Sequence, residues 1–97
     1  MEHYDRQGQP ITFARWAQLH RDDAYHRIAY TEISDEVTVS TVWLGLDHGW
    51  GTGPMLIFET MVFGGPHDQD QWRYTTEVQA LAGHDQAVAL ERDHART

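Results

Sequence analysis

Two long apolar segments separated by a glycine-rich loop constrain the fold of this chain more than any other feature. Residues 37–44 and 55–63 are dense in β-branched, aromatic and long apolar side chains, and turn-forming residues bound both segments. They are typical of central strands. The connection, residues 45–54, contains four glycines and Trp50. We expect this aromatic ring either to fold back over one end of the sheet or to contact a partner.

The second segment predicts a sheet with two apolar faces. Successive side chains of a strand point to opposite sides. If the helices cover only one face, the other remains a large apolar patch, available for dimerisation, for a partner or for cover by the loop and the N-terminal arm. The side chains expected on one side of the strand are Leu56, Phe58, Thr60 and Val62, and those on the other side are Met55, Ile57, Glu59, Met61 and Phe63.

Helix signals lie at both ends of the chain. Thr12 is a good N-cap for an amphipathic helix that ends near residue 21. Thr76 and Gln79 have the spacing of a capping box, which predicts a second amphipathic helix ending at about Arg92 and a frayed tail over 93–97. Gly83 weakens that helix by about 1 kcal/mol relative to alanine, which is tolerable if the helix crosses the sheet closely there.

The predicted order is helix, four consecutive strands, helix. We place the strands at 25–33, 37–44, 55–63 and 71–75, and short connections between them favour an antiparallel meander. The fold class is therefore α+β, with a four-stranded antiparallel meander sheet and a layer formed by the N-terminal and the C-terminal amphipathic helix. With 97 residues, the chain has room for a single small domain, 1–97.

Composition restricts the partners and the compartment. Fifteen acidic residues against seven arginines give a formal charge of −8, which argues against direct binding of nucleic acid and leaves a protein as the expected partner. Cysteine is absent, so we expect neither a disulfide framework nor a thiolate metal site, and the cytoplasm of a bacterial host is the default location. No apolar stretch reaches the roughly 18 residues of a membrane span. Lysine is also absent, a bias that a GC-rich genome would produce.

The chemistry-bearing residues predict no enzyme. Glu59 interrupts an apolar strand, and a cross-strand pair with Arg73 or plain exposure is the favoured explanation over a general acid or base. Asp47 and His48 lie together in the loop, and His67 lies in a later connection, but no metal motif is present, so we expect no metal and no cofactor. His84 is on an apolar helix face, which favours a hydrogen-bonded core histidine. The weak candidates for binding are Asp47, His48, Trp50 and Glu59.

Three segments carry a resemblance: VSTVWLGLDHGWG, PMLIFETMVFGG and WRYTTEVQALAGHDQAV. They resemble a family of short uncharacterised proteins encoded by actinobacterial phages and actinobacterial genomes, over roughly residues 37–90. The family has no established activity, so the resemblance implies a phage or mobile-element origin and no residue roles.

Three functional readings follow. The first is a non-enzymatic phage or mobile-element protein that covers a surface on a host or phage protein. A subclass of this reading is an inhibitor of a nucleic-acid-handling or defence complex, such as an anti-CRISPR. The second is a structural or assembly accessory that dimerises through the open sheet face. The third, a small metal-dependent enzyme, requires His48, Glu59 and His67 to converge.

Overall fold

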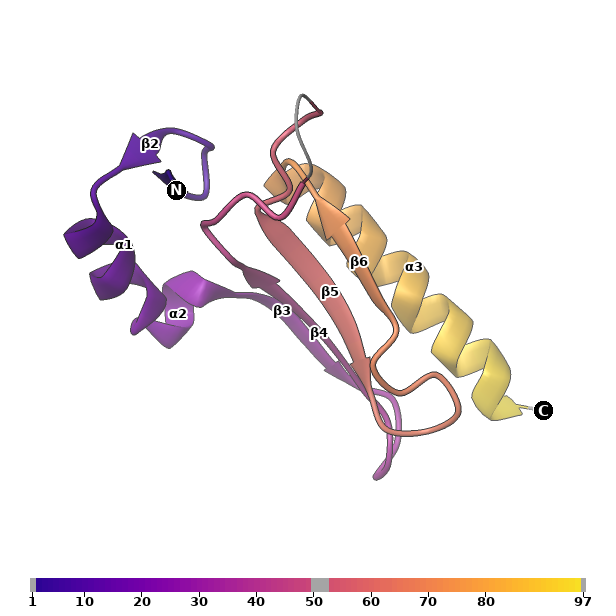
Figure 1. Cartoon of the computed structure of the whole chain (residues 1–97). Coiled ribbons are helices and arrows are strands. Elements are labelled where there is room, and N and C mark those ends of the chain that lie inside the picture. The colour runs from indigo at the N-terminus through magenta and orange to yellow at the C-terminus, as the bar shows by residue number, and fades with distance from the viewer. Residues whose placement is uncertain (1, 50–52, 97) are drawn as a thin grey trace.

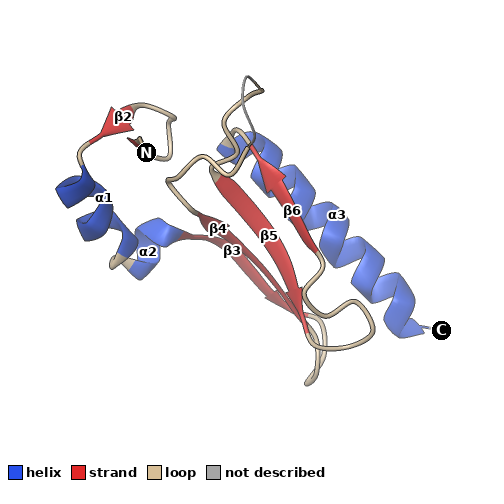
Figure 2. Ribbon diagram, in the orientation of Figure 1, coloured by secondary structure: helices blue, strands red, loops and turns tan. Residues whose placement is uncertain are grey.

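The chain forms a four-stranded sheet flanked by one long helix, with a smaller N-terminal segment beyond one end of the sheet (Figure 1). The computed structural model describes residues 2–49 and 53–96. Figure 2 shows the same elements coloured by type. In chain order they are β1 (His3–Tyr4), β2 (Pro10–Ile11), α1 (Phe13–His20), α2 (Asp23–His26), β3 (Arg27–Glu32), β4 (Thr38–Trp43), β5 (Phe58–Phe63), β6 (Gln71–Tyr74) and α3 (Glu77–Arg96).

The α+β class and the antiparallel meander are confirmed. The strand order is β3-β4-β5-β6, and every neighbouring pair is antiparallel. Two predicted boundaries are wrong. Tyr25 and His26 belong to α2, because the Asp22 side chain accepts backbone N–H bonds from Ala24 and Tyr25 and so caps a helical turn. Residues 55–57 precede β5, because the backbone of Leu56 bonds to the loop at residues 47–48.

Helix α3 covers one face of the sheet. Its predicted capping box is confirmed: the Thr76 hydroxyl accepts the Gln79 N–H at 3.2 Å, and the Gln79 side chain accepts the Thr76 N–H at 3.2 Å. The predicted frayed tail is wrong, since the helix continues to Arg96, which pairs with Asp93 at 3.3 Å. Alternate residues of the two central strands are fully buried beneath this helix: Val39, Thr41, Trp43, Phe58, Thr60 and Val62.

The close crossing expected at Gly83 is present. A Cβ atom built at this position would lie 2.6 Å from Cε1 of Tyr74 and closer still to Cζ and the hydroxyl oxygen. The absent side chain therefore makes room for the Tyr74 ring, which projects from β6 toward the helix.

The N-terminal segment does not join α3 in one helical layer. Figure 1 shows α1 and α2 beyond the end of the sheet, while α3 runs along it. The contact is made at the fully buried Trp43, whose indole N–H donates to the Tyr4 carbonyl at 3.0 Å. Arg6 adds an ion pair of 2.6 Å to Glu77 at the start of α3. A large ring at the sheet end therefore gives the short helices a surface to pack on, so they need not share a sheet face.

Candidate functional site

Asp47 holds the base of the glycine-rich loop. One carboxylate oxygen accepts the N–H groups of Gly49 at 2.8 Å and Leu56 at 2.9 Å. These bonds, with that from Leu56 the larger cause, hold the pKa of the Asp47 carboxyl below its usual range. The His48 N–H donates to the Leu56 carbonyl at 3.0 Å. Asp47 is thus a structural residue here, while Trp50 lies outside the described residues.

Glu59 forms the predicted cross-strand pair. It stands opposite Arg73 in the β5–β6 register, and the guanidinium Nε donates to its carboxylate at 3.0 Å. The Glu59 side chain is only 14% exposed, so Arg73 compensates a charge that is largely withdrawn from water. The pair links β5 to β6 at the edge of the sheet.

The convergence required for a metal-dependent enzyme is not found. His48 lies before β5 and His67 after it, and the six residues of β5 span roughly 20 Å. His67 instead bonds through Nδ1 to Glu91 at 2.7 Å, which raises the pKa of its imidazole, mainly through that hydrogen bond. Within residues 2–49 and 53–96, no three His, Asp or Glu side chains form a group that could hold a metal ion.

His84 is the predicted core histidine, now confirmed. Its Nε2 is 2.9 Å from the Thr31 hydroxyl, and its Nδ1 is 2.8 Å from the Thr41 hydroxyl. Burial lowers the pKa of the imidazole. The ring therefore links α3 to the sheet in its neutral form and is unavailable to solvent.

Among the described residues, no helix lies on the sheet face opposite α3. The side chains on this face point away from the residues buried beneath α3, and they include polar and charged as well as apolar types. Tyr30 on β3 and Phe63 on β5 are each 48% exposed, and Met61, two residues before Phe63 on β5, is half-buried. The Arg27 guanidinium lies over the Tyr30 ring at 4.9 Å. We call this surface the open face, defined by Arg27, Tyr30, Val42, Glu59, Met61, Phe63 and Arg73.

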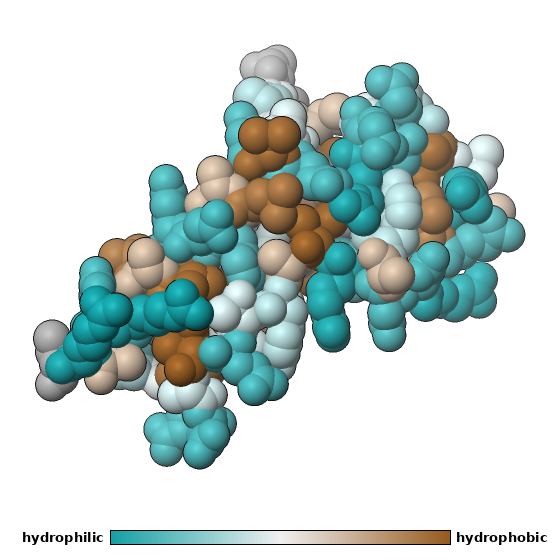
Figure 3. Space-filling view, turned by 180° about the vertical axis from the view of Figure 1, so that it is seen from behind, coloured by the Kyte–Doolittle hydropathy of each residue, from teal (hydrophilic) through white to brown (hydrophobic). Residues whose placement is uncertain are grey.

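The sequence placed part of this surface correctly. Met61 and Phe63 share a side with Glu59, as alternation predicted. Ile57 was assigned to the same side but is fully buried, because it precedes the strand and packs in the core with Trp43. The expected large apolar patch is interrupted by charge. Seen from behind, the molecule likewise shows hydrophobic residues as separate patches among hydrophilic ones (Figure 3).

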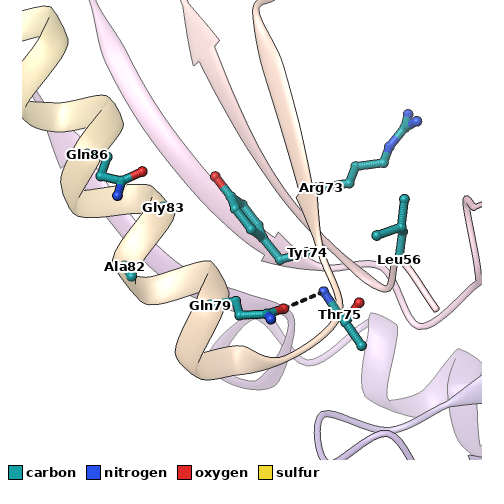
Figure 4. A pocket seen from close by; sticks show the side chains of 8 residues that line it. All are labelled: Leu56, Arg73, Tyr74, Thr75, Gln79, Ala82, Gly83 and Gln86. Carbon is teal, nitrogen blue, oxygen red and sulfur yellow. Dashed lines mark hydrogen bonds between the residues drawn. The ribbon is translucent and has the colours of Figure 1, made fainter. Parts of the chain in front are cut away.

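A groove runs beside β6, between that strand and α3. At one end a cavity of about 420 Å³ includes Tyr74, Gln79, Gly83 and Gln86 in its lining. Figure 4 shows the Tyr74 ring directed toward α3 and the Arg73 side chain on the other side of the strand. At the far end a cavity of about 500 Å³ includes Trp72 and Leu90. No local sequence pattern predicted this groove; the stripe of α3 that faces Trp72 and Tyr74 was the signal that could have revealed it.

Known proteins provide no further guide to this site. Comparison with protein families, curated proteins and solved structures gives no match to the chain. In the described part of the chain, no helix combines the length and the apolar character needed to cross a membrane.

Proposed function

We propose that this chain is a small non-enzymatic protein of a phage or other mobile element that acts by covering a surface on another protein in the bacterial cytoplasm. The observation that supports this most is the open face, which presents two half-exposed aromatic rings, Tyr30 and Phe63, together with Met61. Aromatic residues, methionine and arginine are the types enriched at protein interfaces. Arg27 and Arg73 lie on the same face.

The charge of the chain favours a partner with a basic surface. At least three of the seven arginines, Arg6, Arg73 and Arg96, are paired with the chain's own carboxylates, so they add little free positive charge. The open face itself holds Arg27, Arg73 and Glu59, so the net negative charge is carried by the surface around it, and that charge complements the basic groove of a protein that handles DNA or RNA. Inhibition of such a host complex, as by an anti-CRISPR, is the subclass that we propose first.

The test is capture of a partner from an actinobacterial lysate by Phe63→Asp and Val78→Asp variants, with the bound protein identified by mass spectrometry. Val78 is 78% exposed on α3, so the control adds the same charge away from the open face. We expect both variants to melt within a few degrees of the parent and only Phe63→Asp to lose the partner. Equal capture by both variants, or no partner captured by the parent, would contradict the proposal.

A dimeric assembly accessory is the second candidate, and the same uncovered face supports it. Two chains of charge −8 repel each other, most strongly at low salt, which places this candidate second. Sedimentation equilibrium distinguishes the two. A dimer that the Phe63→Asp variant does not form would favour the accessory role, and a monomer at high concentration would exclude it.

A further inference from the structure

The two edge strands of the sheet are not equivalent. The outer strand β3 contains a register shift between Arg27 and Ala29, a β-bulge of the kind that disrupts an edge. The other outer strand, β6, pairs with β5 from Gln71 to Tyr74 without a shift. β3 is regular only from Ala29 to Glu32, whereas β6 is regular over its whole length and is therefore the better template for a further strand.

The outward backbone groups of β6 follow from the hydrogen-bond pattern. The Val62 N–H donates to the Asp70 carbonyl at 3.0 Å, and in an antiparallel ladder alternate residues bond to the same neighbour. Trp72 and Tyr74 therefore direct their backbone groups to β5. Gln71 and Arg73 direct their N–H and C=O groups to the free edge, where an added strand would bond.

The groove lies directly beside this edge. Trp72 and Tyr74 point toward α3, and a smaller cavity that they share with Gly83, Gln86 and Leu90 joins the two larger ones. Side chains of an added strand that point to the same side as Trp72 would enter this groove. Leu90 is 58% exposed there, so apolar surface is available to be covered.

The end of the groove near the C-terminus of α3 is acidic and aromatic. Its lining consists of three acidic residues, two histidines, an aromatic and an apolar residue: Asp70, Glu91, Asp93, His67, His94, Trp72 and Leu90. Two charges are partly compensated within the chain, Glu91 by His67 at 2.7 Å and Asp93 by Arg96 at 3.3 Å. Asp70 and the Trp72 ring provide a carboxylate and a π face for a cation.

We propose that β6 accepts an extended segment of the partner protein as a fifth strand, with an arginine or lysine of that segment in the acidic end of the groove. This inference rests on the proposed interaction function and names its mode, strand addition, in which main-chain hydrogen bonds supply affinity and the groove selects side chains. A second copy of the chain fits less well, because it is itself acidic and Arg73, the cation on β6, is held by Glu59.

The experiment uses random twelve-residue linear peptides displayed on phage and selected against the full chain. The enriched peptides are then measured by fluorescence anisotropy against three proteins: the parent, Gln71→Pro and Gln71→Ala. Proline at this first strand position removes one outward N–H and is tolerated where that group faces solvent. Alanine removes the side chain and keeps the N–H, so it is the matched control.

We expect enriched peptides with alternating apolar residues and at least one arginine or lysine, bound at least tenfold more weakly by Gln71→Pro and within twofold of the parent by Gln71→Ala. Amide hydrogen exchange at Arg73 should slow on binding. No enrichment, equal binding by the two variants, or a homodimer that only Gln71→Pro abolishes would overturn the inference. If the parent and Gln71→Pro capture a partner equally, strand addition is refuted and the proposed function stands. Loss of capture by Phe63→Asp tests the proposed function only.

Discussion

The contact between Gly83 and Tyr74 predicts that alanine at position 83 changes stability with opposite sign in two backgrounds. In an ordinary helix interior, alanine is about 1 kcal/mol more stable than glycine. Here the added methyl group would overlap the Tyr74 ring, and overpacking of this kind costs about 1–3 kcal/mol. Since two ring carbons and the hydroxyl oxygen of Tyr74 are affected, the upper part of that range applies, and Gly83→Ala should destabilise the parent by about 1–2 kcal/mol.

Removal of the ring should reverse the effect. In a Tyr74→Val background the clash is absent and strand propensity is kept, so Gly83→Ala should stabilise by about 1 kcal/mol. The coupling between the two sites is then about 2–3 kcal/mol, well above the few tenths expected for independent positions. Urea denaturation of the four proteins, followed by far-UV circular dichroism, measures it.

The reasoning fails if Gly83→Ala stabilises both backgrounds equally. That result would mean that the Tyr74 ring swings into the groove without cost and that the helix is not held at close approach. A shift of the melting temperature provides a second measurement, with about 4–8 °C expected per kcal/mol for a domain of this size.

The remaining predictions concern charge, protonation and ligands. Asp47→Ala should lower the free energy of unfolding by about 1–3 kcal/mol in urea, because the N–H groups of Gly49 and Leu56 lose their acceptor; an unchanged midpoint would contradict the structural role. Because folding raises the pKa of His67, this residue adds stability that is fully present below about pH 6.5 and is lost as the pH rises through the folded-state pKa. The His67→Gln substitution should therefore lower the free energy of unfolding more at about pH 5.5 than at about pH 8.5. The fold should need no tightly bound metal, so the melting temperatures with and without EDTA should agree. One zinc ion per chain, found by elemental analysis, would refute this prediction. The purified chain should not shift duplex DNA or RNA in a gel at physiological salt, since its arginines are scattered and partly paired.

Local sequence patterns predicted the parts of the fold that local physics determines. The strands β4 and β5 followed from β-branched and aromatic content, and α3 began at the Thr76 capping box. Glu59 and Arg73 were paired correctly because a carboxylate in an apolar strand needs a partner from the next strand. These inferences required only neighbours in sequence or in the sheet.

The errors arose where distant segments decide the outcome. The position of α1 and α2 depends on Trp43, whose indole is satisfied by the Tyr4 carbonyl across 39 residues. The bond between His67 and Glu91 joins the connection after β5 to α3 across 24 residues, and no local pattern indicated it. No periodicity encodes such contacts.

The polar contacts beneath α3 determine which face is left for a partner. His84 bonds to Thr31 on β3 and to Thr41 on β4, and Thr41 in turn bonds to Thr60 on β5. Opening this layer would leave several buried polar groups without hydrogen-bond partners at once, each at a penalty of about 1–3 kcal/mol. Because a domain of this size is only marginally stable, such an opening approaches the free energy of complete unfolding. The covered face is therefore closed to binding in the native state, and of the sheet itself only the open face and the edge at β6 remain for a partner.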